Sequence, residues 1–173
     1  MNIINAIINL INTTSRCVMN NTDGSNRANN MGEGLEKYIK DIFANTIYSS
    51  SNDRKTIQHQ TFSYLGSKNY SPDAMLRGGD AIEIKKIENR SSDIALNSSH
   101  PKQKLSKQDN RVATACKTAR DDSDWEERDI IYVVGYVPKG TDTLKMLGMV
   151  YGTEYCASQD VYESIFHTVK DKI

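Results

Sequence analysis

Residues 72–87 read Pro-Asp-Ala-Met-Leu-Arg-Gly-Gly-Asp-Ala-Ile-Glu-Ile-Lys-Lys-Ile, and this stretch decides how the sequence folds. Two short segments with alternating apolar residues, 73–77 and 81–87, lie on either side of the pair Gly78 and Gly79. Short apolar segments joined by glycines are typical of antiparallel strands connected by a tight turn. The stretch therefore predicts a β-hairpin whose second strand is the longer one.

The hairpin carries the chemically interesting side chains Asp73, Glu83 and Lys85. Alternate residues of a strand share a face, so Glu83 and Lys85 point the same way. Asp73 joins that face only if the turn has an odd number of residues. A three-residue connection over 78–80, a common hairpin type, places Asp73 opposite Lys85, whereas a two-residue turn places it on the other face. Asp80 has the opposite parity to Glu83 and is the weaker ligand candidate.

These residue types suit metal-dependent hydrolysis of a phosphodiester. Asp73 and Glu83 supply the hard oxygen ligands that Mg²⁺ prefers, and the carbonyl of Ile84 adds a third oxygen. Lys85 is placed to orient or deprotonate the attacking water and to offset phosphate charge. Glu36, on an expected helix upstream, is a candidate for a supporting carboxylate. The alternative is that Glu-x-Lys on a strand is only a solvated face, and the local pattern leaves both interpretations open.

The rest of the chain predicts an α/β protein with a mixed β-sheet flanked by helices. The run Ile-Ile-Tyr-Val-Val within 129–137 is apolar on both faces, which predicts a central strand. Polar stretches at 20–30 and from 49 onward are expected to be loops, and 88–107 shows no clear periodicity. The expected helices cover 1–11, 31–47, 110–120 and 161–169, and the expected strands cover 62–65, 73–77, 81–87, 129–137 and 144–151.

Composition bounds the class of protein. The chain of 173 residues fits one domain, and 22 basic residues balance 22 acidic ones. Cys17, Cys116 and Cys156 are widely spaced, which indicates reduced thiols and a cytoplasmic protein. The apolar N-terminus has helical spacing without a basic start or a cleavage site, and no run is long enough to cross a membrane.

A local excess of positive charge lies after the hairpin. From residue 85 to residue 120 nine Lys and Arg side chains face three Asp and Glu side chains, which predicts a basic patch beside the candidate site. An ordinary charged surface is the alternative. Polar and basic residues in this segment have the groups that reach phosphates and base edges. The candidates for DNA contact are Asn97, Ser98, Ser99, Lys102 and Lys104.

Pro72-Asp73 with Glu83-Ile84-Lys85 resembles the PD-(D/E)xK nuclease motif. Longer blocks are more specific, since residues 71–86 and 95–105 are similar to type II restriction endonucleases of the NgoPII type. Residues 30–38 and 129–135 resemble further blocks of the same family. The resemblance covers most of the chain from about residue 26 onward.

This resemblance implies a single domain over 1–173 with a restriction-endonuclease-like core. It implies a Mg²⁺-dependent homodimer that cuts both strands of double-stranded DNA at a short palindrome, GGCC, and a companion DNA methyltransferase that protects host DNA. Asp73, Glu83, Lys85 and Glu36 take the catalytic positions. Family members are longer than this chain, so a further C-terminal part is expected.

Three other functions stay open at this stage. One is a different nuclease of the same fold that acts in repair or on branched junctions. Another is a catalytically inactive DNA-binding fragment. The third is a soluble α/β interaction protein in which the motif is accidental. Digestion of plasmid DNA with Mg²⁺ distinguishes these classes. Discrete bands indicate a restriction enzyme, a smear indicates another nuclease, and retained binding without cleavage indicates an inactive fragment.

Overall fold

The computed structural model of the chain describes residues 1–18, 27–67, 70–94, 100–119, 122 and 124–170. Its elements are, in chain order, α1 (Ile3–Asn12), α2 (Arg27–Ala44), α3 (Ser51–Thr61), β1 (Phe62–Tyr64), β2 (Ala74–Leu76), β3 (Ala81–Ile87), β4 (Lys104–Ser106), α4 (Thr114–Lys117), β5 (Glu127–Tyr136), β6 (Met146–Tyr151), α5 (Gly152–Tyr155) and α6 (Gln159–Lys170).

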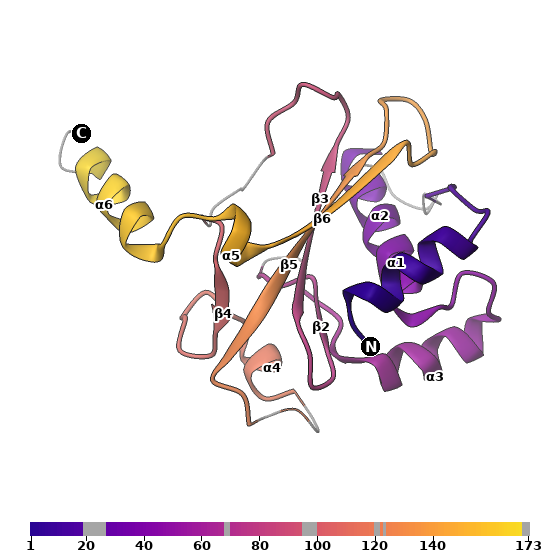
Figure 1. Cartoon of the computed structure of the whole chain (residues 1–173), viewed down its shortest axis with the longest axis horizontal. Helices are drawn as coiled ribbons and strands as arrows, with labels where there is room; N and C mark the ends of the chain where they lie inside the picture. Colours follow the sequence, from indigo (N-terminus) through magenta and orange to yellow (C-terminus); the bar gives the residue numbers. More distant parts are fainter. Residues whose placement is uncertain (19–26, 68–69, 95–99, 120–121, 123, 171–173) are drawn as a thin grey trace.

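A mixed six-stranded sheet forms the centre of the molecule (Figure 1). Its strands run in the order β1-β2-β3-β5-β4, and β6 also pairs with β5. The β3–β5 pair is parallel over its whole length, from Ala81 beside Ile130 to Ile87 beside Tyr136. The other strand pairs are antiparallel. This arrangement confirms the α/β fold with a mixed sheet flanked by helices.

The two faces of the sheet are covered by different helices. Ile82 and Ile84 of β3 belong to a core cluster that includes the apolar side of α2 and Ala6 of α1. The neighbouring Ala81 belongs to a second cluster on the opposite face, together with Cys116 of α4. Period-two alternation in β3 therefore separates the two halves of the core.

Strand β5 is central, as its apolar run predicts. Ile130 and Ile131 are both fully buried although they point to opposite faces. The strand has β3 on one edge and β4 and β6 along the other, so its backbone groups are paired on both sides. A strand in this position needs apolar residues on both faces because helices cover both.

Helix α3 forms where the sequence predicts a loop. Ser50 caps its first turn by accepting a hydrogen bond at 3.2 Å from the amide of Asp53. The helix buries none of its residues and only Ile57 packs partly against the core, so it has little apolar periodicity to recognise. The Ser50 cap therefore stabilises the start of a helix whose sequence lacks the apolar periodicity by which helices are predicted.

Other boundaries also differ from expectation. Helix α2 begins at Arg27, so 27–30 is helical rather than loop. The expected helix over 110–120 shortens to α4, because the amide of Arg111 bonds the Asp109 carboxylate at 2.8 Å in a turn. Strand β4 lies in the segment without periodicity, since three residues are too few to show any. None of the helices within the described ranges is long and apolar enough to cross a membrane.

The segment leading into β4 is pressed against Gly152, the first residue of α5. A Cβ atom at Gly152 would overlap the carbonyl oxygen of Lys102 and lie 2.6 Å from the carbonyl oxygen of Gln103. Both obstacles are backbone atoms, which cannot move as a flexible side chain can. Close approach of two backbones is thus the reason for glycine here.

We expect Gly152→Ala to lower the free energy of unfolding by about 2 kcal/mol, since the backbone must shift to admit the methyl group. Gly148→Ala in β6 is the matched control, because a Cβ there meets nothing within 4 Å. Urea unfolding followed by Trp125 fluorescence measures both variants. Equal stabilities of the two alanine variants would contradict the packing argument.

Candidate active site

The turn between β2 and β3 sets which side chains meet. The amide of Leu76 donates to the carbonyl of Asp80 at 2.9 Å, and Ala74 and Met75 lie in register with Ile82 and Ala81. Three residues, 77–79, therefore connect the strands, and Gly78 at their centre has a φ of +59°. The connection is odd in length, as the site hypothesis requires. It closes one residue earlier than the expected 78–80 turn.

Because the turn closes one residue earlier, Asp73 lies opposite a different residue of β3. Extending the observed register by one residue places Asp73 opposite Glu83, and the predicted pairing with Lys85 is wrong. The amide of Asp73 donates to the carbonyl of Ile82 at 3.0 Å. Its carboxylate oxygen Oδ2 accepts a hydrogen bond from the amide of Ile84 at 2.6 Å. Asp73 is thus fastened to β3 through both its backbone and its side chain.

Glu83 is buried, and each of its carboxylate oxygens has a protein partner. Oε1 accepts a hydrogen bond from the Lys85 ammonium at 2.7 Å, and Oε2 accepts one from the Ser71 hydroxyl at 2.7 Å. Glu83 is only 8% exposed, which makes these contacts necessary to offset its lost hydration. The sequence pattern did not single out Ser71, whose position directly before Pro72 is the signal that could have done so.

The pKa of the Asp73 carboxyl group is raised. Burial, followed by the neighbouring charges of Glu83 and Glu36, raises the pKa of its carboxyl to about 7, although the Ile84 amide and the Lys85 ammonium act to lower it. The side chain lies partly buried beside the carboxylate of Glu83. Two close carboxylates of this kind lower their free energy when a positive charge joins them.

Glu36 lies near this pair but is engaged elsewhere. Its carboxylate is 3.6 Å from the ammonium of Lys40 one turn along α2, and its side chain is 37% exposed. Its charge nevertheless reaches Asp73 strongly enough to raise the pKa of that carboxyl. The sequence-predicted Glu36 therefore comes to the edge of the site.

The donor set suits a hard divalent cation. Asp73 and Glu83 contribute carboxylate oxygens from adjacent strands, and Ile84 lies between Glu83 and Lys85 on β3. Within the described ranges, no three His, Cys, Asp or Glu side chains gather as a ready-made metal cluster. Two carboxylates with a backbone carbonyl fit Mg²⁺, which usually keeps several waters, better than they fit an all-protein cage.

A narrow cavity adjoins the carboxylates. Its volume is about 10 Å³, close to the smallest that admits one water molecule. One side is formed by Ser71 and by Glu83 and Lys85 of β3, and the other by the segment 100–102 that precedes β4. The lining residues are Ser71, Glu83, Lys85, His100, Pro101, Lys102 and Tyr132.

Tyr132 holds the second wall of this cavity in place. It lies beside Glu83 in the β3–β5 register, and its hydroxyl accepts a hydrogen bond from the amide of Lys102 at 2.7 Å. The same hydroxyl donates to the carbonyl of Lys102 at 3.3 Å. One buried phenol therefore fixes both backbone groups of the residue that follows Pro101. Tyr132 lies in the apolar run that predicts a central strand, and nothing in that run indicated this contact.

The structure describes two of the five residues predicted to contact DNA. Asn97, Ser98 and Ser99 lie outside the described residues. Lys102 is buried and its ammonium lies 3.3 Å from the Asp109 carboxylate, so it is not free to meet a phosphate in this conformation. Lys104 is about half exposed.

The expected basic patch is largely neutralised by neighbouring carboxylates. Each of the following lies within 4.0 Å of a carboxylate oxygen: Lys85, Lys86, Lys102, Lys104 and Arg111. Three of these residues pair with Glu88 or Asp109, which the count over 85–120 already included. Lys85 and Lys104 pair with carboxylates just outside that segment, at Glu83, Glu127 and Asp129. Acidic residues that flank the segment thus reduce its local excess of positive charge.

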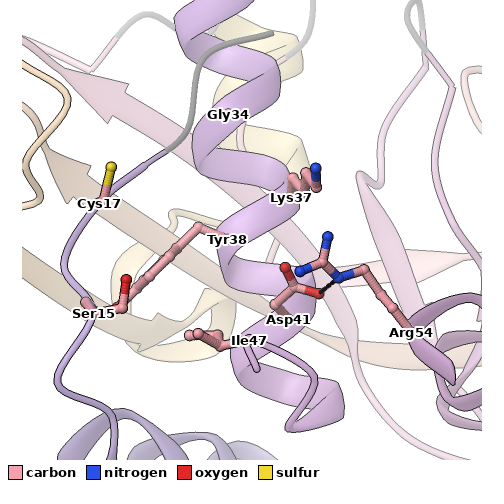
Figure 2. Close-up of a pocket in the computed structure, with 8 residues that line it drawn as sticks. All are labelled: Ser15, Cys17, Gly34, Lys37, Tyr38, Asp41, Ile47 and Arg54. Atoms are coloured by element: carbon pink, nitrogen blue, oxygen red, sulfur yellow. Dashed lines mark hydrogen bonds and ion pairs between the residues drawn. The ribbon is translucent and has the colours of Figure 1, made fainter. Parts of the chain in front are cut away.

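A second cavity lies on the other side of α2, beside the segment 15–17 (Figure 2). Its acidic group, Asp41, is engaged through one oxygen: Oδ1 accepts hydrogen bonds from Thr46 and Gln58 and lies 3.1 Å from Nε of Arg54. This network joins α2 to α3. It therefore has a structural role in the helical layer.

Comparison with known proteins adds an independent observation. The model of a family described as NgoPII restriction endonuclease matches residues 1–173. The type II restriction enzyme NgoPII of Neisseria gonorrhoeae is 49% identical over 173 residues, which is the full length of this chain and 61% of that enzyme. The chain thus spans less than two thirds of that relative. No solved structure matches.

The raised pKa of Asp73 predicts a pH-dependent stability. Between the ordinary aspartate value of 3.8 and about 7, the folded chain binds more protons at this site than the unfolded chain does. Stability therefore falls as pH rises through that window. We expect Asp73→Asn, which cannot ionise, to be increasingly more stable than the parent from pH 4 to pH 8 in the presence of EDTA.

Urea unfolding at each pH measures this difference. Glu154→Gln is the control, since it removes the same charge from an exposed position in α5. A stability difference between Asp73→Asn and the parent that stays constant with pH would contradict the electrostatic account of the site.

Proposed function

Because the chain belongs to the NgoPII restriction endonuclease family, we propose that it is a type II restriction endonuclease, which hydrolyses phosphodiesters of double-stranded DNA at a GGCC palindrome. The observation that carries the proposal is the pair Asp73 and Glu83 held together beside Lys85. This arrangement provides two hard anionic ligands and one cation at a single point on the sheet. The motif is therefore a spatial cluster as well as a sequence pattern.

Mg²⁺ is the proposed cofactor. Asp73, Glu83 and the carbonyl of Ile84 would hold it, and the bound ion would supply Lewis-acid polarisation of the phosphoryl group and a more acidic water. The raised pKa of Asp73 supports this assignment: burial and the charge of Glu83 both disfavour its ionised form, and a bound cation offsets both effects.

The protein's own groups position the reactants. Ser71 orients the Glu83 carboxylate through Oε2, and the Ile84 amide orients the Asp73 carboxylate through Oδ2. The Lys85 ammonium donates to Glu83 at 2.7 Å. If Glu83 binds a cation, that ammonium would be released to turn to the attacking water or to a phosphate oxygen. Glu36 adds negative charge near Asp73 and favours the cation-bound state.

The partners follow from the proposed reaction. A palindromic duplex presents two equivalent scissile phosphates, which a two-fold homodimer matches with one site each. Lys104, which lines the neighbouring cavity, is proposed to contact DNA together with Asn97, Ser98 and Ser99. Lys102 would join them once its ammonium leaves Asp109. A companion methyltransferase would protect the host's own GGCC sites.

Plasmid digestion with Mg²⁺ tests the activity. We expect discrete fragments from the parent chain, and a loss of cleavage of at least about a hundredfold in Asp73→Ala and in Lys85→Ala, because each removes a group that acts at the reacting phosphate. Single-turnover rates on a duplex with one GGCC site provide the measurement.

Two neighbouring residues serve as matched controls. Asp80→Ala removes a carboxylate directly before β3 that accepts a hydrogen bond from Tyr151 at 3.1 Å, and Lys86→Ala removes an ammonium that pairs with Glu88. Both should cleave as the parent does. A smear of products would favour a non-specific nuclease, binding without cleavage an inactive DNA-binding chain, and full activity in Asp73→Ala would exclude the mechanism.

A further inference from the structure

His100 lies at the cavity beside Glu83 and Lys85, although the motif does not include it. Its ring stacks on Tyr162 of α6 with centroids 5.0 Å apart, and it meets Phe166 at 6.0 Å. The residue is 8% exposed and lines both this cavity and the larger one that continues toward Lys104.

The neighbour at Nδ1 fixes the tautomer of the ring. Arg111 approaches Nδ1 of His100 at 3.1 Å through a guanidinium nitrogen. A guanidinium can only donate hydrogen bonds, so Nδ1 must accept and the ring proton must be on Nε2. Burial, followed by the charges of Arg111 and Lys102, lowers the pKa of His100, which keeps the ring neutral.

Within the part of the chain that the structure describes, the hydrogen bond of this ring is the one at Nδ1. Nε2 is not among the buried side-chain atoms that lack a partner, so its N–H keeps some accessible surface and is available to an acceptor that enters the cavity. The position is also well fixed, because Tyr132 holds the backbone of Lys102 and Gly152 packs on the same peptide. The fold thus holds a neutral donor beside the catalytic residues.

We propose that His100 donates a hydrogen bond from Nε2 to a non-bridging oxygen of the DNA phosphodiester bound against Glu83 and Lys85. A phosphodiester oxygen is a strong acceptor with no proton of its own, and the ammonium groups of Lys85 and Lys102 border the same cavity. A neutral donor adds a directional contact without competing as a cation for Glu83. This inference rests on the proposed nuclease function.

Three substitutions separate this role from simple packing. His100→Gln places an amide N–H near the position of Nε2, whereas His100→Asn reaches only as far as Nδ1. His100→Phe keeps the ring contact with Tyr162 but has no donor. A merely structural histidine would be replaced best by Phe, and a phosphate donor would be replaced best by Gln.

The readouts are the dissociation constant of a 20-base-pair duplex with one GGCC site, measured in Ca²⁺ without turnover, and the single-turnover cleavage rate in Mg²⁺. We expect His100→Phe and His100→Asn to lose cleavage by at least about tenfold, as for a lost hydrogen bond to a charged group, and His100→Gln to lose clearly less. His59→Phe, at an exposed histidine of α3, should match the parent.

The outcomes distinguish this inference from the proposed function. If the parent cleaves and the Gln, Asn and Phe variants cleave alike, only the role of His100 is overturned. If the parent binds the duplex without cleaving it, the nuclease proposal fails, and the ranking of the dissociation constants still decides the phosphate contact. If the parent neither binds nor cleaves the duplex, both proposals fail.

Discussion

The parallel pairing of β3 with β5 is the constraint on which the rest of the structure depends. It runs through all seven residues of β3 and places the strand that carries Glu83 and Lys85 in the middle of the sheet. One face of β3 presents Ile82 and Ile84 to the core cluster that includes α2. The other face carries Glu83 and Lys85 next to Ala81 of the second core cluster. Helix packing thereby supports the candidate site from behind.

The same pairing brings distant segments to the site. Tyr132 is beside Glu83 because of the β3–β5 register, and its hydroxyl then fixes the backbone at Lys102. The segment 100–102 becomes the second wall of the cavity beside Glu83. The contact between Tyr132 and the backbone of Lys102 thus determines which segment faces the two carboxylates, although neither residue belongs to the motif.

At Asp73, burial of the side chain opposes ionisation of its carboxyl group. Burying Asp73 next to Glu83 raises the pKa of Asp73 and costs stability at neutral pH, while Ser71, Lys85 and the Ile84 amide offset part of that cost. Sites that must bind a cation commonly retain such unfavourable charge, because it becomes favourable on binding. The local instability is therefore consistent with a function for the pair.

The sequence by itself determined the mixed α/β architecture, the central position of β5, and the requirement for an odd turn before β3. Those features follow from hydrophobic period and strand parity, which are local properties of the chain. Only the tertiary structure decided that Asp73 pairs in register with Glu83, that Ser71 orients Glu83, and that Tyr132 and His100 complete the cavity. It also decided that Lys102 is neutralised by Asp109 and that α3 is a helix. These outcomes depend on which hydrogen bond closes a turn and on which distant charges and backbones meet, and neither is encoded in the local pattern.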